Sequence, residues 1–355
     1  MSRNLFYFLL FITLASGNSF AHADILEDSS AATIYSYFNI TNEDVDSSLS
    51  MDKFEKQIEE IGIGNYTAMS LTELLQKEDK GEAVPPNTIA ITFDEPDSET
   101  YARAFPLLIE QKIPFAVFIS PGNTSDQEWE ALENLQQTGL VTIGLSSYSY
   151  GHNGSWNEEK VTADLNAAKA LYREKLKAEP LYFAYPFGEY SSIFVDVVRE
   201  MGFKAAFGQN SGVLTYLSDR MKLPRFTMTD EFGDLDRFRM TSNAMPLPVR
   251  DVQPDVSYMT SMPIIGFTLD DKIRQDAEKT KCFASGENQP DTIHLGSGRI
   301  EVIFKESPVT DRLRINCTIA VPGEFPEDEP RYRWLGYLMY FPSITSQVDT
   351  SPVQP

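Results

Sequence analysis

The sequence predicts an α/β protein: a distorted (β/α) barrel over residues 31–243, followed by a small all-β sandwich over residues 258–342. As far as residue 243, short runs rich in β-branched and aromatic residues alternate with amphipathic helical segments, the pattern typical of βα units. A Pro-rich segment at 244–257 interrupts this pattern and predicts a linker. Beyond it, apolar residues alternate between Gly and Pro turns without helical periodicity, which is typical of a sandwich.

The predicted barrel strands are short and rich in Val, Ile, Phe and Tyr, the residues that favour extended backbone. They cover residues 33–38, 88–93, 115–119, 141–145, 181–185, 204–207 and 223–226. The predicted helices carry apolar residues three or four positions apart, as in Phe54, Ile58 and Ile61. They cover residues 52–61, 70–76, 101–110, 126–137, 158–176 and 193–201, and Ser70 is a favourable N-cap.

The C-terminal part predicts strands over residues 300–304, 313–319 and 331–340, with a tail at 343–355. It contains the two cysteines of the chain, Cys282 and Cys317. In an oxidising compartment a disulfide between them is the default expectation. A zinc site would need more soft ligands than the nearby His294. We expect Trp334 and Phe341 to be core residues rather than platforms for sugar rings.

Residues 1–23 have the features of a secretory signal peptide. Arg3 gives a charged start, residues 5–14 are an uninterrupted apolar run, and Ala21-His22-Ala23 matches an A-x-A cleavage site. A membrane anchor needs about 20 apolar residues, and this run is too short. We therefore expect a soluble mature protein in the periplasm or outside the cell.

The formal charge is −22, and removal of residues 1–23 takes away Arg3 and no acid, so it becomes −23. This acidity argues against nucleic acid, whose binding depends on Lys and Arg replacing counterions. It is compatible with a neutral or cationic partner such as a partly deacetylated amino-sugar polymer. The simpler alternative is that the acidity only keeps an exported protein soluble.

The first chemical motif is Thr92-Phe93-Asp94-Glu95-Pro96, at the end of the strand predicted over 88–93. In parallel βα folds, catalytic side chains lie at the carboxyl ends of strands. The motif resembles the Thr-Phe-Asp-Asp-Gly signature of the NodB-homology polysaccharide deacetylases, carbohydrate esterase family 4. The resemblance implies a NodB-type barrel with Asp94 as general base. It also implies that Glu95, in place of the second Asp, is a ligand of a catalytic divalent metal ion. A solvated turn is the alternative interpretation.

The second motif begins at Ile143-Gly144 and is similar to the family's Ile-Gly-x-His-Thr-x-x-His, whose two histidines bind the metal. In this register the histidine positions hold Ser146 and Tyr150. Neither hydroxyl is a usual ligand for a zinc-like ion. His152 follows two residues later and is a candidate ligand if the loop is rebuilt, or else an ordinary loop histidine.

The third motif, Phe183-Ala184-Tyr185-Pro186-Phe187-Gly188, is similar to a segment of the periplasmic, PgaB-like subgroup. That resemblance implies that the backbone N–H of Phe187 helps to hold the oxyanion. Residues 207–212 and 223–226 extend the match. The subgroup also has an early Tyr-His whose His is the general acid, but this chain has Tyr37-Phe38 there.

The resemblance implies an N-acetylated glycan as partner and a zinc-like divalent metal as cofactor, yet the metal and acid histidines are missing. We expect metal binding to be weak or absent. Three functions are compatible with these residues. They are a metal-dependent deacetylase with a rebuilt site, a deacetylase-fold protein that binds glycan with weak or lost turnover, and a non-enzymatic envelope protein that acts through its β domain.

Overall fold

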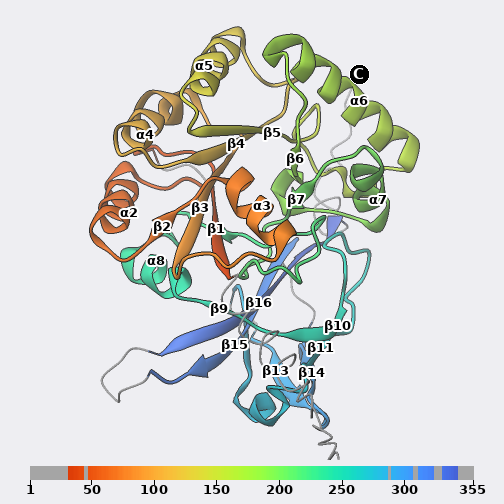
Figure 1. The fold of residues 1–355 in the computed structure, drawn as a ribbon. Helices are drawn as coiled ribbons and strands as arrows, with labels where there is room; N and C mark the ends of the chain where they lie inside the picture. Colours follow the sequence, from red (N-terminus) through yellow and green to blue (C-terminus); the bar gives the residue numbers. More distant parts are fainter. Residues whose placement is uncertain (1–30, 44–46, 287–288, 307–310, 324–329, 343–355) are drawn as a thin grey trace, which may run out of the picture.

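The computed structural model describes residues 31–43, 47–286, 289–306, 311–323 and 330–342 (Figure 1). The predicted signal peptide at 1–23 and the tail at 343–355 lie outside the described residues. Figure 1 shows a sheet wrapped by helices in the upper part of the view and a second group of strands below it. No described helix has the length and apolar character that crossing a bilayer requires.

The first unit is built on a curled parallel sheet in the order β7-β6-β5-β4-β3-β1-β8, with β2 also paired to β3. This arrangement confirms the predicted α/β barrel class, and β7 and β8 form the two ends of the order. Its strands are β1 (Ala32–Tyr37), β2 (Thr67–Ala68), β3 (Thr88–Asp94), β4 (Phe115–Ile119), β5 (Val141–Leu145), β6 (Tyr182–Ala184), β7 (Ala205–Phe207) and β8 (Phe226–Thr227).

Seven helices of this unit are described. They are α2 (Met51–Ile63), α3 (Leu71–Lys80), α4 (Ser98–Glu110), α5 (Asp126–Gln137), α6 (Glu158–Leu176), α7 (Ser192–Glu200) and α8 (Leu235–Ser242). Ser70 caps α3 as predicted, since its side chain accepts a hydrogen bond from the N–H of Glu73. Helix α8, which Asp234 caps, has only a weak signal in the sequence and was not predicted. Leu74 and Leu75 of α3 pack with Ile34 and Ala90 of the sheet, so α3 fills part of the barrel.

The second unit consists of two four-stranded sheets, β10-β11-β14-β13 and β12-β15-β16-β9. The sheets share an apolar core that includes Phe267, Ile300, Ile315 and Met339, which confirms a second, all-β unit. Its strands are β9 (Met245–Pro246), β10 (Val249–Gln253), β11 (Ile265–Leu269), β12 (Lys281–Ala284), β13 (Asp291–His294), β14 (Arg299–Ile303), β15 (Arg312–Val321) and β16 (Arg331–Tyr340). A short 3₁₀ helix, Arg274–Lys279, lies between β11 and β12.

The predicted linker at 244–257 is wrong, because this segment contains β9 and β10. β9 pairs with β16, and β10 pairs with β11. Each is the last strand of its sheet, and an edge strand tolerates proline because its outward N–H needs no partner. The prolines therefore mark the edges of the sandwich rather than a connection outside it.

The predicted Cys282–Cys317 disulfide is present. The two cysteines face one another across β12 and β15, with their Cα atoms 4.0 Å apart. Trp334 and Phe341 are buried. Phe341 lies in the sandwich core, whereas Trp334 packs edge-on against Phe226 of the barrel, with ring centroids 5.2 Å apart.

The sandwich packs against the barrel through β16. Gly212, between β7 and β8, forms a β-bridge with Leu335 of β16. The approach is close: a Cβ on Gly336 would lie 2.3 Å from the carbonyl oxygen of Ser211. The side of the curled sheet between β7 and β8 is therefore covered by the β domain, which reaches the carboxyl ends of the barrel strands.

Candidate active site

The carboxyl ends of the parallel strands bring the motif residues together. Asp94 is the last residue of β3, and Ser146 follows β5 directly. Phe187 lies in a short 3₁₀ turn after β6, and Gln209 follows β7. Catalytic groups of βα barrels are found at this end, so the fold places these residues where a site is expected.

Asp94 forms a buried ion pair with Arg225. Nη1 and Nη2 of Arg225 each lie 2.7 Å from a different carboxylate oxygen of Asp94, and both side chains are almost completely buried. Arg225 also donates to the carbonyl of Gly208 and the hydroxyl of Thr92. This bidentate geometry fixes the orientation of the Asp94 side chain. Arg225 lies in the segment 223–226 that resembles the family, but the resemblance assigned it no role.

Glu95 is held differently from its neighbour. Its backbone φ of 50° lies in the left-handed region, which is uncommon for a residue other than glycine. Oε1 of Glu95 is buried and has no hydrogen-bond partner in the structure. Burial, assisted by the nearby charge of Asp94, raises the pKa of Glu95 to about 8. Glu95 is therefore mostly protonated at neutral pH, whereas Asp94 is paired with a cation.

The two positions that correspond to metal-binding histidines make hydrogen bonds within the protein. The hydroxyl of Ser146 donates to the carbonyl of Ala184 at 2.9 Å. The hydroxyl of Tyr150 accepts the backbone N–H of Phe187 at 3.0 Å. Burial raises the pKa of Tyr150, so the phenol stays neutral. The backbone donor predicted to hold an oxyanion is therefore bonded to a side chain of the chain itself.

His152 lies in a stack of aromatic rings beside these residues. Its ring is 4.5 Å from that of Phe187 and 4.4 Å from that of Tyr340, nearly parallel to both. Nδ1 of His152 is 2.8 Å from Oε2 of Glu189, a buried carboxylate. The contacts of His152 are thus made with the loop after β6 and with the end of β16.

Two arginines of β15 complete the site, and the sequence analysis did not identify them. Arg312 donates to Oε1 of Glu189 at 3.0 Å, to Oε1 of Gln209 at 2.9 Å and to the carbonyl of Phe187. Arg314 donates to the carbonyl of Gln209 at 2.7 Å. In β15 the alternate residues Leu313 and Ile315 face the sandwich core. The Arg-x-Arg alternation was the available signal, but it does not reveal what the other face contacts.

Comparisons with known proteins identify the family of this unit. The polysaccharide deacetylase family model matches residues 81–206, the segment that contains Asp94, Glu95, Ser146, Tyr150 and Phe187. The chain carries a NodB-type polysaccharide deacetylase domain. The poly-β-1,6-N-acetyl-D-glucosamine N-deacetylase of Staphylococcus aureus is 26% identical over 212 residues, covering 55% of this chain and 72% of that protein. The enzyme of the same name in Staphylococcus epidermidis is 22% identical, covering 52% and 69%.

Solved structures show the same fold. A de-N-acetylase from Aggregatibacter actinomycetemcomitans superposes with a TM-score of 0.54 at 12% identity, covering 59% of this chain and 99% of that one. IcaB from Ammonifex degensii superposes with a TM-score of 0.53 at 21% identity, covering 60% and 95%. At these identities the similarity supports the barrel of the deacetylase domain, not its activity.

The residues of this deacetylase domain do not fit the divalent metal that the family generally uses. Among the described residues, no group of three or more His, Cys, Asp and Glu side chains could hold a metal ion. Both carboxylate oxygens of Asp94 are bonded to Arg225, and Glu95 is mostly protonated. Ser146 and Tyr150 supply only neutral hydroxyls. The general-acid position is also apolar, because Phe38 follows Tyr37 at the end of β1.

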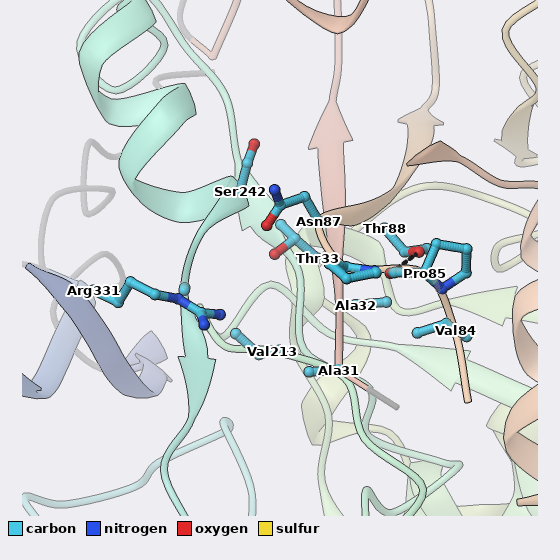
Figure 2. Close-up of a pocket in the computed structure, with 12 residues that line it drawn as sticks. Ala31, Ala32, Thr33, Val84, Pro85, Asn87, Thr88, Val213, Ser242 and Arg331 are labelled. Carbon is cyan, nitrogen blue, oxygen red and sulfur yellow. Dashed lines mark hydrogen bonds between the residues drawn. The ribbon is translucent and has the colours of Figure 1, made fainter. Parts of the chain in front are cut away.

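Two cavities lie away from these residues of the deacetylase domain. The smaller, of about 210 Å³, is at the amino ends of β1 and β3, where Thr33, Asn87, Ser242 and Arg331 supply polar groups (Figure 2). The larger, of about 420 Å³, is a groove between the β7–β8 connection and the β sandwich. Asp94, Glu95 and Tyr150 line neither cavity.

Proposed function

We propose that this chain is an exported polysaccharide deacetylase-family protein that binds N-acetylated amino-sugar polymers with weak or lost deacetylase activity. The substrate class rests on the staphylococcal relatives, whose names specify poly-β-1,6-N-acetyl-D-glucosamine. The alignment with the Staphylococcus aureus protein covers 212 residues. Export rests on the features of residues 1–23. A mature protein that begins at Asp24 in the cell's exported fraction is the result expected from N-terminal sequencing.

The observation that carries the loss of turnover is the hydrogen bond between Tyr150 and Phe187. Amide hydrolysis of this type requires a group that stabilises the developing oxyanion and a group that protonates the leaving amine. The Phe187 N–H is bonded to the Tyr150 hydroxyl, and no imidazole stands at positions 146, 150 or 38. A base alone supplies roughly 10²–10⁴-fold, far less than most enzymatic accelerations.

The alternative function is a deacetylase with a rebuilt site, and one observation favours it. Glu95 is a mostly protonated carboxylic acid next to Asp94, the carboxylate that pairs with Arg225, and its Oε1 has no hydrogen-bond partner among the described residues. A carboxylic acid held protonated in an active site can act as a proton donor. This alternative predicts that hydrolysis depends on both carboxyl groups.

The test compares acetate release and binding with one probe, a β-1,6-linked N-acetylglucosamine oligomer. We expect the mature protein to bind the oligomer in calorimetry and to release no more acetate than an Asp94→Asn variant, with either zinc or EDTA present. Metal-dependent release that disappears in Asp94→Asn would establish an enzyme. Neither binding nor release would favour the envelope-protein function. Circular dichroism of both proteins verifies that Asp94→Asn is folded, and a Glu95→Gln variant provides a second measurement.

A further inference from the structure

The groove between the barrel and the sandwich is not lined by Asp94, Tyr150 or Phe187. Its volume of about 420 Å³ lies within the range typical of ligand pockets, about 300–1,000 Å³. One wall is the β7–β8 connection, which includes Thr215, Leu217 and Asp219, and the other comes from β10, β16 and the loops beside β10. The groove therefore exists because the sandwich is docked on the barrel.

The same docking fills the carboxyl end of the barrel. Arg312 and Arg314 bond to the loops after β6 and β7, and Tyr340 stacks on His152. A polymer chain that entered between these side chains would have to break part-buried hydrogen bonds. Binding in the groove requires no such displacement.

The lining of the groove suits a sugar ring. Pro224, Pro246 and Leu335 supply apolar surface, while Thr215 and Ser218 supply hydroxyl groups. A pyranose ring has the same division, because its C–H faces are apolar and its edges carry polar groups.

The charges of the groove favour a cation. Its lining contains the carboxylates of Asp219, Asp255 and Asp270 but only the ammonium groups of Lys222 and Lys272. Nζ of Lys222 is shared between Asp219 and Asp255, whose side chains remain 46% and 74% exposed. The whole chain has a formal charge of −22, and a field of this sign attracts cationic polymers.

We propose that this groove binds glucosamine oligomers from which some N-acetyl groups have been removed. The proposal rests on the proposed function and locates its binding site. The free amines of such an oligomer are ammonium groups that pair with Asp219, Asp255 and Asp270, and the C–H faces pack on the apolar surface. The ligand is the product of amide hydrolysis, so an amide hydrolase acting on the polymer must supply it.

The test measures the affinity of the mature protein for two β-1,6-linked glucosamine oligomers of equal length, one fully N-acetylated and one partly de-N-acetylated. We expect the partly de-N-acetylated oligomer to bind about tenfold or more tightly, with the difference shrinking as salt is added. An Asp219→Asn, Asp255→Asn, Asp270→Asn triple variant should abolish this preference. Leu217→Ala should weaken both oligomers, since Leu217 is 63% exposed beside the groove.

Asp196→Asn is the matched control, because Asp196 is an exposed aspartate paired with an arginine of the same helix and is absent from the groove lining. If the wild type binds neither oligomer, the proposed function itself fails. If it binds but the groove variants behave like Asp196→Asn, the groove assignment fails and the proposed function stands. Equal affinity of the wild type for the two oligomers would also overturn the proposal. Thermal unfolding of each variant verifies that it is folded.

Discussion

The hydroxyl oxygen of Tyr150 accepts a hydrogen bond from the backbone N–H of Phe187 at 3.0 Å. Tyr150 stands where the family's motif has a metal-binding histidine, and Phe187 supplies the backbone donor that the family uses for the oxyanion. The Tyr150 side chain therefore affects two catalytic functions. It stands in place of a metal-binding histidine, and it engages the backbone N–H that would otherwise stabilise the oxyanion.

Restoring imidazoles should restore metal affinity. In a Ser146→His, Tyr150→His double variant, two histidines lie beside Glu95, and metal binding would favour the ionised form of Glu95 over the protonated one. We expect stoichiometric zinc or cobalt binding by calorimetry that is at least about a hundredfold tighter than in the wild type. Adding Glu95→Ala should weaken it again. Sub-micromolar zinc binding by the wild type, lost in Glu95→Ala, would contradict our assignment of the site.

Removing Arg225 should destabilise the barrel strongly. Arg225→Met leaves the carboxylate of Asp94 buried without a cation, and the expected loss is about 3–5 kcal/mol in the free energy of unfolding. Because the partners are coupled, an Asp94→Asn, Arg225→Met double variant should lose less than the sum of the two single variants. Urea denaturation measures all three. Strictly additive losses would argue against the ion pair.

The pKa of Glu95 predicts a pH dependence of stability. Its folded pKa of about 8 lies above the ordinary value of 4.5, so between these pH values the folded state binds more protons than the unfolded state. The free energy of unfolding should therefore fall as pH rises through this range, by up to about 1.4 kcal/mol per pH unit from this group. Glu95→Gln should flatten the profile and increase stability above pH 8. An unchanged profile would show that the carboxyl is already ionised.

Arg312 should contribute more to stability than a surface arginine of the same sandwich. Arg312→Ala leaves the buried Glu189 with only His152 and removes bonds to Gln209 and Phe187, so a loss of roughly 3 kcal/mol is expected. Arg331→Ala is the control, because Arg331 is exposed and, within the described part of the chain, donates to the backbone carbonyl of Asn243. We expect it to lose less than about 1 kcal/mol. If chemical denaturation shows similar losses of unfolding free energy for the two variants, the buried contacts of Arg312 do not contribute as proposed.

The disulfide should stabilise the sandwich by restricting its unfolded state. Cys282 and Cys317 are 35 residues apart, and closing a loop of this length stabilises a protein by about 3–4 kcal/mol in the chain-entropy model. A Cys282→Ala, Cys317→Ala variant should unfold at a correspondingly lower denaturant concentration. Adding a reducing agent should lower the stability of the wild type but leave the variant unchanged.

Local patterns were sufficient for most of the fold. The strand and helix periodicities are properties of neighbouring residues, and they identified the barrel elements, the strand at 331–340 and the cysteine pair. The prolines at 246 and 248 were misinterpreted, because a local signal for interrupted pairing does not distinguish a linker from an edge strand. The left-handed backbone conformation of Glu95 was also not predictable. A positive φ is usually signalled by Gly, and Glu gives no such signal.

The site was less predictable because its contacts are distant in sequence. Asp94 and Arg225 are separated by 131 positions, and Arg312 lies 125 positions from Phe187. Family motifs located Asp94, Ser146 and Tyr150, since they lie within the matching segment. No family motif covers β15, so nothing in the sequence linked its arginines to the barrel.

The close packing of Gly336 against Ser211 couples the two units mechanically. A Cβ at position 336 would lie 2.3 Å from the carbonyl oxygen of Ser211, so a side chain there would push β16 away from the loop that follows β7. The same loop contains Gln209, which is bonded to both arginines of β15. A shift of the sandwich strand is therefore transmitted to the loop at the mouth of the barrel.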